Sequence, residues 1–595
     1  MTGEAHRPAH HRGRGRPRPE RDPRDRRGLA VRALALALAG GAVAAAVALG
    51  TAGDGRASGD SHRDGRAGSA LQAAAAMPAM APASAATSTW YCTAGTAVPD
   101  GMADHTVVMA NTGTDDRTAT VTVLAGDLKR PGVPSAGAPP DPVVRQVPVP
   151  AGKRVTLRLG EVVQAPLAAA VVEVDGGGVA VEHAVNGPQG ADVTPCSSFA
   201  APAWHFAWGT TTRDARELVV FFNPFPSPAT IDGVFMTEDG PREPTRLQGF
   251  PVPPRSVVGI DLGDDVTRSE EVAGTFRARS GRVVVERITQ HDGSLGIRGL
   301  TLGLGAPEAA TTWVFADGEA SVPSPQTPPP GAELTTTTTS TTTTTTTASA
   351  TTTTTAAGAE PDNGLSSEKI VVYNPGHEQA KVDVRLRPGA DDEAGVPQPF
   401  HLTVAGGGYE VVDYGGQPRV TAGLDHATVV QSTNGVPVVA ERVTVDTMPP
   451  TAPVPGRRRT APRPEAPPGE MSAGTGARLA ARDWTFPTIS LSAEGVAGFA
   501  VYNPDPHQPV RVELFGLGAD TEQTGVTAIS VPPGGRATIP FAPDVAVAAE
   551  GVVVRAPRPI VVDRLVAESD GRRLALGPGL PALDGAKLLS DLSAD

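Results

Sequence analysis

Four pairs of adjacent acidic and basic residues are the part of this chain most suited to chemistry. The pairs are Glu182-His183, Glu286-Arg287, Glu441-Arg442 and Asp563-Arg564. Paired carboxylates about 5 to 10 Å apart could hydrolyse a glycosidic bond, and a His or an acid could act as a general base. A chain seldom needs one active site four times, whereas a packing solution is readily repeated. We therefore interpret Glu182, Glu286, Glu441 and Asp563 as structural acceptors that lock the last strand of a repeat.

Other catalytic signatures are absent from the sequence. It has no His-Glu-x-x-His, no Gly-x-Ser-x-Gly, no phosphate-binding Gly-rich loop and no calcium loop of EF-hand spacing. Adjacent acids such as Asp264-Asp265, Glu270-Glu271 and Asp391-Asp392 stand in loop-like segments, which indicates solvated charge. We therefore predict no catalytic residue, no cofactor-binding residue, no metal ligand and no cofactor.

Each acid-base pair ends a longer repeated pattern, in which a Trp is followed by an apolar run that ends in Asn. The Trp residues are Trp90, Trp204, Trp313 and Trp484, and the Asn residues are Asn111, Asn223, Asn374 and Asn503. We predict that the Trp side chains anchor the core of the first strand. The Asn side chains should form turns by bonding the backbone two residues further on.

Short apolar runs between turn residues indicate strands throughout the repeats. Leu218 to Phe222 and Ile370 to Tyr373 are β-branched or aromatic and stop at Asn-Pro, while Val382 to Leu386 alternates with a period of two. Asn434-Gly435 lies between two apolar runs and predicts a hairpin. The predicted fold class is all-β, with four tandem antiparallel β-sandwich (Ig-like) domains and disordered linkers. The alternative is a propeller with two small blades per copy, which long linkers between copies disfavour.

Composition and spacing set the expected domain boundaries. Gly and Pro number 68 and 59 of 595 residues, so we expect disordered spacers between the folded segments. The stretch from Thr335 to Thr355 is almost entirely Thr or Ser, and we expect it to be disordered and to accept O-linked sugars. The expected segments are a basic leader 1–28, a transmembrane or signal helix 29–50, a linker 51–86, sandwich 1 at 87–200, sandwich 2 at 201–305, sandwich 3 at 306–446 with an insert 321–364, a Pro/Arg-rich linker 447–480, sandwich 4 at 481–586 and a tail 587–595.

The N-terminus predicts export and anchoring. Its first 27 residues hold nine Arg against four acids, and Ala33 to Gly50 is 18 residues without a charge. This length favours an uncleaved single membrane span over a cleaved signal peptide, and the positive flank should stay in the cytoplasm. We expect the remaining chain to be extracytoplasmic, or secreted if the signal is cleaved.

The two cysteines, Cys92 and Cys196, bracket the first copy. In an oxidising compartment such a pair most plausibly forms a disulfide between the first and last strands of one domain; the alternative is two free buried thiols. The net charge is −13 although the leader is basic, so the exported part is more acidic still. This excess of acid disfavours nucleic acid as a partner.

The whole pattern resembles an uncharacterised family of actinobacterial secreted or membrane-anchored proteins, a domain of unknown function. The resemblance rests on Trp, Val-Val-x-Asn-Pro, Val-Pro-x-x-x-x-Val and Pro-Val-Val-Ala-Glu-Arg, repeated between Trp90 and Leu583; the first copy departs from it at Gly113 and His183. It implies no known reaction. We expect a non-enzymatic envelope protein that acts as a scaffold or as a binding module for a cell-wall polysaccharide or an envelope protein. The alternative is a carbohydrate-active accessory protein or a glycan-processing enzyme, which would need an exposed aromatic platform or convergent acids.

Overall fold

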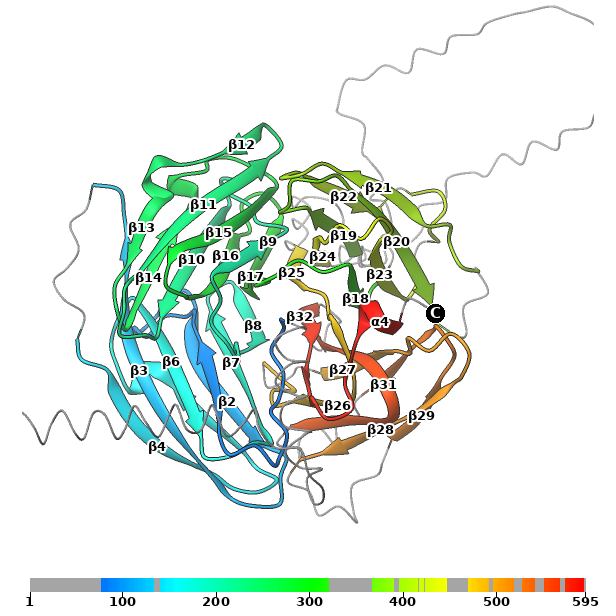
Figure 1. The fold of residues 1–595 in the computed structure, drawn as a ribbon, viewed down its shortest axis with the longest axis horizontal. Coiled ribbons are helices and arrows are strands. Elements are labelled where there is room, and N and C mark those ends of the chain that lie inside the picture. Colours follow the sequence, from blue (N-terminus) through cyan, green and yellow to red (C-terminus); the bar gives the residue numbers. More distant parts are fainter. Residues whose placement is uncertain are drawn as a thin grey trace, which may run out of the picture. The chain divides into compact units, whose positions relative to one another are not determined.

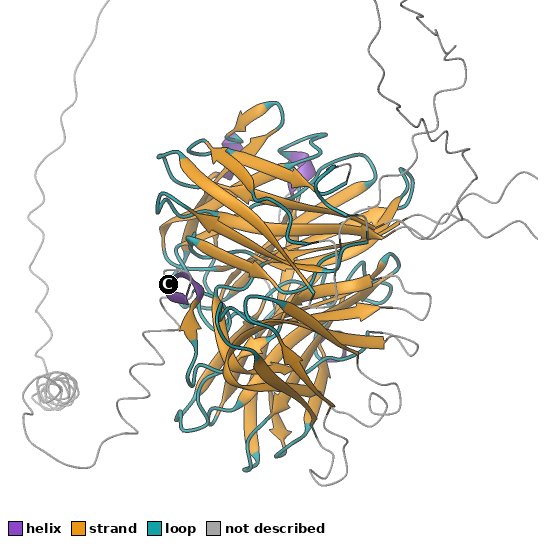
Figure 2. Cartoon of the chain, turned by 90° about the vertical axis from the view of Figure 1, so that its right-hand side faces the viewer, coloured by secondary structure: helices purple, strands orange, loops and turns teal. Residues whose placement is uncertain are grey.

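The computed structural model describes residues 76–132, 140–319, 366–389, 395–415, 417–421, 423–446, 469–491, 496–517, 527–540, 551–567 and 573–592. The chain divides into the units Met1–Asp60 and Ser61–Asp595, and all the described residues belong to the second. Strands make up nearly all of its regular structure (Figure 2), which confirms the predicted all-β class.

The strands fall into four repeats that follow the pattern seen in the sequence (Figure 1). Repeat 1 consists of β1 (Ser88–Cys92), β2 (Asp104–Asn111), β3 (Arg117–Lys129), β4 (Val143–Val149), β5 (Arg154–Arg158), the 3-10 turn η1 (Leu159–Glu161), β6 (Leu167–Val174), β7 (Val179–Gly187) and β8 (Gly190–Pro195). Repeat 2 consists of β9 (Ala203–Phe206), β10 (Ala215–Asn223), β11 (Ala229–Thr237), β12 (Gly240–Arg242), η2 (Thr245–Leu247), β13 (Gln248–Val252), β14 (Ser256–Asp261), η3 (Leu262–Asp264), β15 (Val272–Ser280), β16 (Val284–Asp292) and β17 (Ile297–Leu304).

Repeats 3 and 4 have the same order of strands. Repeat 3 consists of β18 (Thr312–Phe315), β19 (Ser366–Tyr373), β20 (Ala380–Pro388), β21 (Phe400–Val404), β22 (Tyr409–Asp413), β23 (His426–Ser432), β24 (Val439–Asp446) and β25 (Gly469–Thr475). Repeat 4 consists of β26 (Leu479–Phe486), β27 (Val496–Tyr502), β28 (Val510–Gly516), β29 (Thr527–Val531), β30 (Arg536–Pro540), β31 (Val552–Ala567), β32 (Arg573–Pro578), β33 (Leu580–Pro581), β34 (Lys587–Leu588) and the helix α4 (Leu589–Leu592).

Each repeat is built from two antiparallel sheets. In repeat 1 they have the orders β1-β6-β3-β4 and β5-β2-β7-β8, and in repeat 3 the orders β18-β23-β20-β21 and β22-β19-β24-β25. Repeats 2 and 4 follow the same scheme, except that in repeat 4 the long strand β31 serves both sheets. The two sheets of a repeat share one core, as when Trp90 of β1 and Val107 of β2 belong to the same buried cluster.

The sheets and cores continue from one repeat to the next. Strand β3 of repeat 1 pairs in parallel with β14 of repeat 2, and β17 of repeat 2 pairs in parallel with β25 of repeat 3. Buried residues of repeats 3 and 4 likewise form a single cluster, which includes Val314, Val429, Trp484 and Val554. The repeats are therefore parts of one packed body, in which no repeat has a core to itself.

The hairpin predicted at Asn434-Gly435 is wrong, although the turn itself is present. Gly435 adopts a positive φ of 78° in a turn between β23 and β24, but these two strands belong to different sheets. The strands before and after Asn111, β2 and β3, are also in different sheets. Ala556-Pro557 is a further turn signal in the sequence, but it does not form a turn, because it lies inside the continuous strand β31. A turn signal is local, whereas the choice of partner strand depends on which faces become buried together.

The pairing order also corrects the expected Ig-like topology. An immunoglobulin domain pairs strands A, B, E and D in one sheet and C, F and G in the other. Here the first strand pairs with the sixth, and the second strand pairs with the fifth and the seventh. Turn residues in the sequence predict how many strands a repeat has, but the same number of strands is compatible with several pairing orders.

Three predicted segment boundaries need correction. Residues 76–86 of the predicted linker 51–86 are described, with Met77, Ala79 and Met80 buried. Strand β25, the last strand of repeat 3, lies in the predicted linker 447–480, and β34 and α4 lie in the predicted tail 587–595. These segments are short, and their order depends on pairing with other strands, as β25 pairs with β24 and β34 pairs with β26.

Two other predictions fall on residues that the structure does not describe. The predicted span 29–50 and the insert 321–364 both lie outside the described ranges. Within those ranges, no helix has the length and apolar character needed to cross a membrane.

Candidate functional site

The four acid-base pairs join each repeat to its neighbour through buried ion pairs. The base of one repeat meets the acid of the next repeat, and the base of repeat 4 meets the acid of repeat 1. The distances are 3.3 Å for His183 Nε2–Glu286 Oε2, 3.0 Å for Arg287 Nη2–Glu441 Oε2, 3.8 Å for Arg442 Nη2–Asp563 Oδ2 and 3.0 Å for Arg564 Nη1–Glu182 Oε1. All eight side chains are buried. We call this closed series of contacts the ion-pair cycle.

Each acid of the ion-pair cycle also accepts a backbone N–H from the preceding repeat. The donors all lie three or four residues after a repeat Trp. They are Ala94 N to Glu286 at 2.7 Å, Ala207 N to Glu441 at 3.1 Å, Ala316 N to Asp563 at 2.9 Å and Thr488 N to Glu182 at 3.0 Å. The acids thus act as acceptors between repeats, whereas the sequence pattern suggested a lock within a repeat. Burial raises the pKa of Asp563 to about 6, against the opposing effect of Arg442.

The three arginines of the cycle lie over aromatic rings. Arg287, Arg442 and Arg564 stand 5.3, 5.6 and 5.7 Å from the ring centroids of Phe206, Phe315 and Phe486. Each Phe is two residues after a repeat Trp, so the first strand supplies both an aromatic face and a backbone donor to the same contact. In repeat 1 the corresponding position is Cys92, and the base is His183.

His183 replaces arginine with the help of a second histidine. His105 Nδ1 lies 2.8 Å from the carbonyl oxygen of Ala168, which can only accept, so Nδ1 of His105 carries the proton and donates. In the neutral ring Nε2 of His105 is then an acceptor, and it accepts from His183 Nδ1 at 2.9 Å. His183 Nε2 lies 3.3 Å from Glu286 Oε2 and so occupies the place that an arginine guanidinium takes in the other three contacts. Burial, with the adjacent His183, lowers the pKa of His105 well below its ordinary value and keeps that ring neutral.

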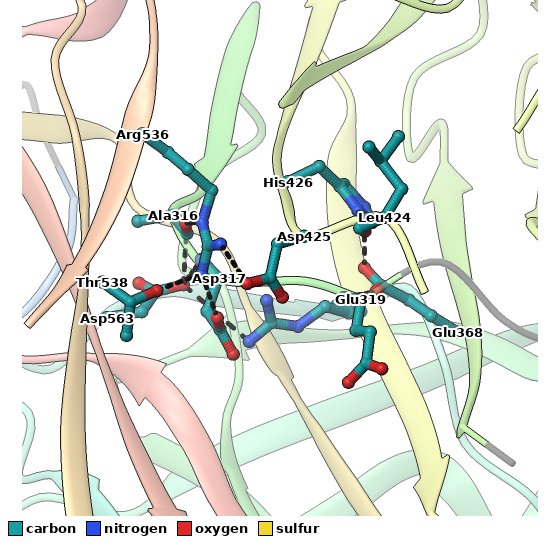
Figure 3. A network of polar contacts seen from close by, with 11 residues as sticks. Ala316, Asp317, Glu319, Glu368, Leu424, Asp425, His426, Arg536, Thr538 and Asp563 are labelled. Atoms are coloured by element: carbon teal, nitrogen blue, oxygen red, sulfur yellow. Dashed lines mark hydrogen bonds and ion pairs between the residues drawn. The ribbon is translucent and has the colours of Figure 1, made fainter. Parts of the chain in front are cut away.

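A second buried network connects repeats 3 and 4 (Figure 3). Arg536 of β30 donates to Asp317 at 2.7 Å and to Thr538 at 2.9 Å, and it lies 3.2 Å from Asp425. Its Nε donates to Ala316 O, next to the N–H that Asp563 accepts. Arg536 is buried, so these partners compensate the cost of desolvating its charge.

The four repeat Trp side chains are buried. Trp204, Trp313 and Trp484 each donate Nε1–H to a backbone carbonyl just before the seventh strand or its equivalent, at Val283, Val438 and Ile560. Stacking against a sugar requires an exposed ring. The carbohydrate-active alternative therefore loses these four residues as its aromatic platform.

The four repeat Asn side chains form the turns expected from the sequence. Asn111, Asn223, Asn374 and Asn503 accept from the backbone N–H two residues further on, at Gly113, Phe225, Gly376 and Asp505. Their amide groups donate to carbonyls across the turn, as Asn223 does to Ser227 and Val252. All four side chains are buried, so the bonds satisfy polar groups that water does not reach.

The disulfide between Cys92 and Cys196 is present. Cys92 ends β1 in one sheet of repeat 1, and Cys196 follows β8 of the other sheet. The bond therefore connects the two sheets of the repeat. Cys92 stands at the position, two residues after the repeat Trp, where the other repeats carry a Phe.

A pocket lies where β8, the eighth strand of repeat 1, meets its equivalents in the other repeats, which are β17, β25 and β32. The strands β8, β17, β25 and β32 contact one another in a closed series (Figure 1). The residues that pair with the four cycle acids, Pro195, Leu304, Thr475 and Pro578, all line this pocket. We call it the eighth-strand pocket; the strands that line it pair with β7, β16, β24 and β31, which carry the ion-pair cycle.

Two charged residues of the eighth-strand pocket break the similarity between repeats. Asp192 accepts from Val193 N at 2.7 Å and from Leu302 N of repeat 2 at 2.7 Å, and burial raises its pKa to about 7. Arg478 is 6% exposed and donates to Glu308 O at 3.3 Å. Neither residue has a counterpart in the repeat pattern, so the sequence comparison between copies overlooked both.

Within the described ranges, no group of three or more His, Cys, Asp or Glu residues could hold a metal ion. The adjacent acids have separate partners: Asp265 pairs with Arg246, and Glu271 pairs with Lys369.

Arg536 was also missed in the sequence. The sequence did contain a signal for the ion-pair cycle, namely the constant order of acid and base in every copy. A buried acid needs a counter-charge, and two adjacent residues of one strand point to opposite faces, so the base has to come from another copy.

The comparisons with known proteins give a family without a known activity. Residues 182–475 match the model of a Family of unknown function (DUF5719). This range is narrower than the sequence resemblance from Trp90 to Leu583. The chain matches no curated protein. Two solved structures are similar to parts of it. The crystal structure of Thermotoga maritima 1070 is 18% identical over 19% of this chain and 94% of that chain, with a TM-score of 0.15. The Anabaena sensory rhodopsin transducer is 20% identical over 23% of this chain and 88% of that chain, with a TM-score of 0.14.

Proposed function

We propose that this protein is a non-enzymatic extracytoplasmic envelope protein tethered to the membrane. Its residues 182–475 match the model of a family of unknown function, which assigns no activity. Its role is that of a scaffold or a binding module for a cell-wall glycan or a protein partner. The observation that carries the proposal is the use of all four recurrent acid-base pairs in contacts between repeats. The residues that the copies share thus build a rigid body.

The tether rests on the N-terminal sequence. An Arg-rich leader followed by 18 uncharged residues favours a single span with the leader inside. High Ala, Gly, Pro and Arg usage fits a GC-rich genome, such as that of an actinobacterium. A chain that lacks residues 29–50 should leave the membrane fraction of host cells after a carbonate wash, whereas the full chain should stay. Equal retention of both chains would contradict the tether.

The scaffold role is tested with residues 61–595 as a purified protein. It is incubated with cell-wall glycan or with solubilised envelope proteins from the host, and retention is compared with that of an unrelated acidic β-sandwich protein. We expect retention above this control without release of sugars into the supernatant. Release of soluble sugar that grows with time would show an enzyme and contradict the proposal, as would retention no greater than the control's.

A further inference from the structure

The eighth-strand pocket contains an arginine whose charge is only partly compensated. Arg478 Nη1 donates to the carbonyl of Glu308, but among the described residues Nε has no acceptor and the guanidinium has no carboxylate in ion-pair contact. The negative charge of Glu308 offsets the charge of Arg478 in part, but not within ion-pair distance, and burial lowers the pKa of Arg478 to about 10. The desolvation of this buried cation is therefore not repaid by an ion pair. The other buried arginines of this region, such as Arg287, Arg536 and Arg564, all have a carboxylate partner.

The surroundings of Arg478 are suited to a ligand with one negative charge. Its guanidinium lies 5.4 Å from the ring centroid of Trp313, and Met77, Leu304 and Ala306 add apolar walls to the pocket. Asp192 lines the same pocket, but burial raises the pKa of its carboxyl to about 7 and both its oxygens accept backbone N–H groups, so it does not pair with Arg478. A planar guanidinium donates two parallel hydrogen bonds to a carboxylate.

We propose that the eighth-strand pocket is a binding site for a small monocarboxylate, whose carboxylate pairs with Arg478 and whose apolar part packs against Met77 and Leu304. The pocket belongs to the body formed by the four repeats, so the proposal goes beyond the envelope role and does not depend on it. Failure of glycan or envelope-protein retention would leave it intact.

The test uses residues 61–595 and compares N-acetylglycine, N-acetylglycinamide and inorganic phosphate. The acid and its amide have nearly the same size, so their difference isolates the carboxylate. We expect the acid to raise the melting temperature and to give a saturable calorimetric isotherm at concentrations up to about 10 mM, the range of weak small-ligand sites. The amide and phosphate should do neither. Absence of acid binding, or equal binding of the amide or of phosphate, would overturn the proposal.

Two variants separate a ligand site from a structural cation. Arg478→Met keeps the length of the side chain and removes the charge; it should weaken binding of N-acetylglycine by about tenfold or more, the usual effect of losing a charge-assisted pair. Without ligand its melting temperature should equal or exceed the parent's, because an uncompensated charge has been removed from the interior. The control Arg511→Met changes an arginine whose side chain is 70% exposed and should leave binding unchanged.

The same pair of variants also shows when the proposal is wrong. If Arg478→Met binds N-acetylglycine as tightly as the parent, the carboxylate is held elsewhere. If the variant melts well below the parent and the parent shows no response to the acid, Arg478 is a structural cation and the pocket is not a carboxylate site.

Discussion

At the residue scale, the recurring acid of each repeat makes two contacts that the sequence does not show. Glu441 lies on β24, accepts the N–H of Ala207 from repeat 2 and pairs with Arg287 of the same repeat. Both partners of the pair are buried, and Arg287 lies over Phe206 and Trp208. Loss of either charge leaves the other one buried without compensation, which is more costly than the loss of the contact itself.

We predict that Glu441→Ala lowers the free energy of unfolding by about 3 kcal/mol or more, the typical cost of breaking a buried ion pair from one side. Urea denaturation followed by circular dichroism measures the change. Glu410→Ala, which removes an exposed carboxylate from the same repeat, should change stability by less than about 0.5 kcal/mol.

A double variant identifies the cause. If Arg287→Leu accompanies Glu441→Leu, no charge is left unpaired, and the pair of changes should cost less than Glu441→Ala alone. An unfolding midpoint for Glu441→Ala equal to the parent's would contradict the assigned role.

At the element scale, the first strand of each repeat organises the contact to the next. It carries the buried Trp, then the aromatic residue under an arginine, then the backbone donor to an acid, as in Trp204, Phe206 and Ala207. In repeat 1, β1 instead ends in Cys92, which is bonded to Cys196 beyond β8. This repeat replaces an aromatic contact by a covalent link between its two sheets.

We predict that the double variant Cys92→Ser with Cys196→Ser is less stable than the parent by about 2 to 5 kcal/mol, since the bond closes a loop with a sequence separation of 104 residues. Urea denaturation with and without reductant measures this. Reductant should destabilise the parent and leave the double variant unchanged.

The state of the sulfurs is checked by alkylation in urea, because both cysteines are buried in the folded protein. Without reductant neither cysteine should be labelled. Labelling of both would show free thiols, against the structure.

At the scale of the whole molecule, the repeats are closed on themselves. Arg564 of repeat 4 pairs with Glu182 of repeat 1, and the segment before β1 joins the same repeats, since Met80 N donates to Pro581 O and Gly178 N donates to Ala81 O. The expected objection to closure, the long linkers between copies, does not apply. Lengthening a loop costs only the logarithm of its length, so a long insert is compatible with closure.

We predict that removal of repeat 4, by ending the chain at Gly476, prevents stable folding of the remaining three repeats. The truncation removes Arg564 and Thr488, the partners of Glu182, and uncovers apolar residues of repeat 3 such as Val314 and Val429. Size-exclusion chromatography and thermal denaturation should show aggregation or loss of the cooperative transition.

The matched control keeps every repeat and moves only the chain ends. A circular permutant that begins at Ala477, ends at Gly476 and joins Leu592 to Ala76 by a Gly/Ser linker has the same break as the truncation but retains repeat 4. It should unfold in one transition close to the parent's. A three-repeat chain that remains a folded monomer with the parent's melting temperature would show independent domains instead.

Sequence alone determined the repeated local structure of this protein. The β-branched runs and turn residues predicted an all-β chain, the Asn residues predicted their own turns, and the position of the two cysteines predicted their bond. These features depend on residues within one short segment or on a simple pairing, so local chemistry is sufficient to find them.

Only the tertiary structure decided which strands pair and which charges meet. Asn434-Gly435 signals a turn equally well within a sheet or between two sheets, so the sequence led to a hairpin that does not exist. The acid of one copy and the base of another are separated by 154 residues in the pair Arg287–Glu441. The contact between these two side chains depends on the packing of whole repeats. The eighth-strand pocket with Arg478 depends on it in the same way. The free energy that selects both comes from burying the surfaces of several repeats together, which no single segment of sequence can show.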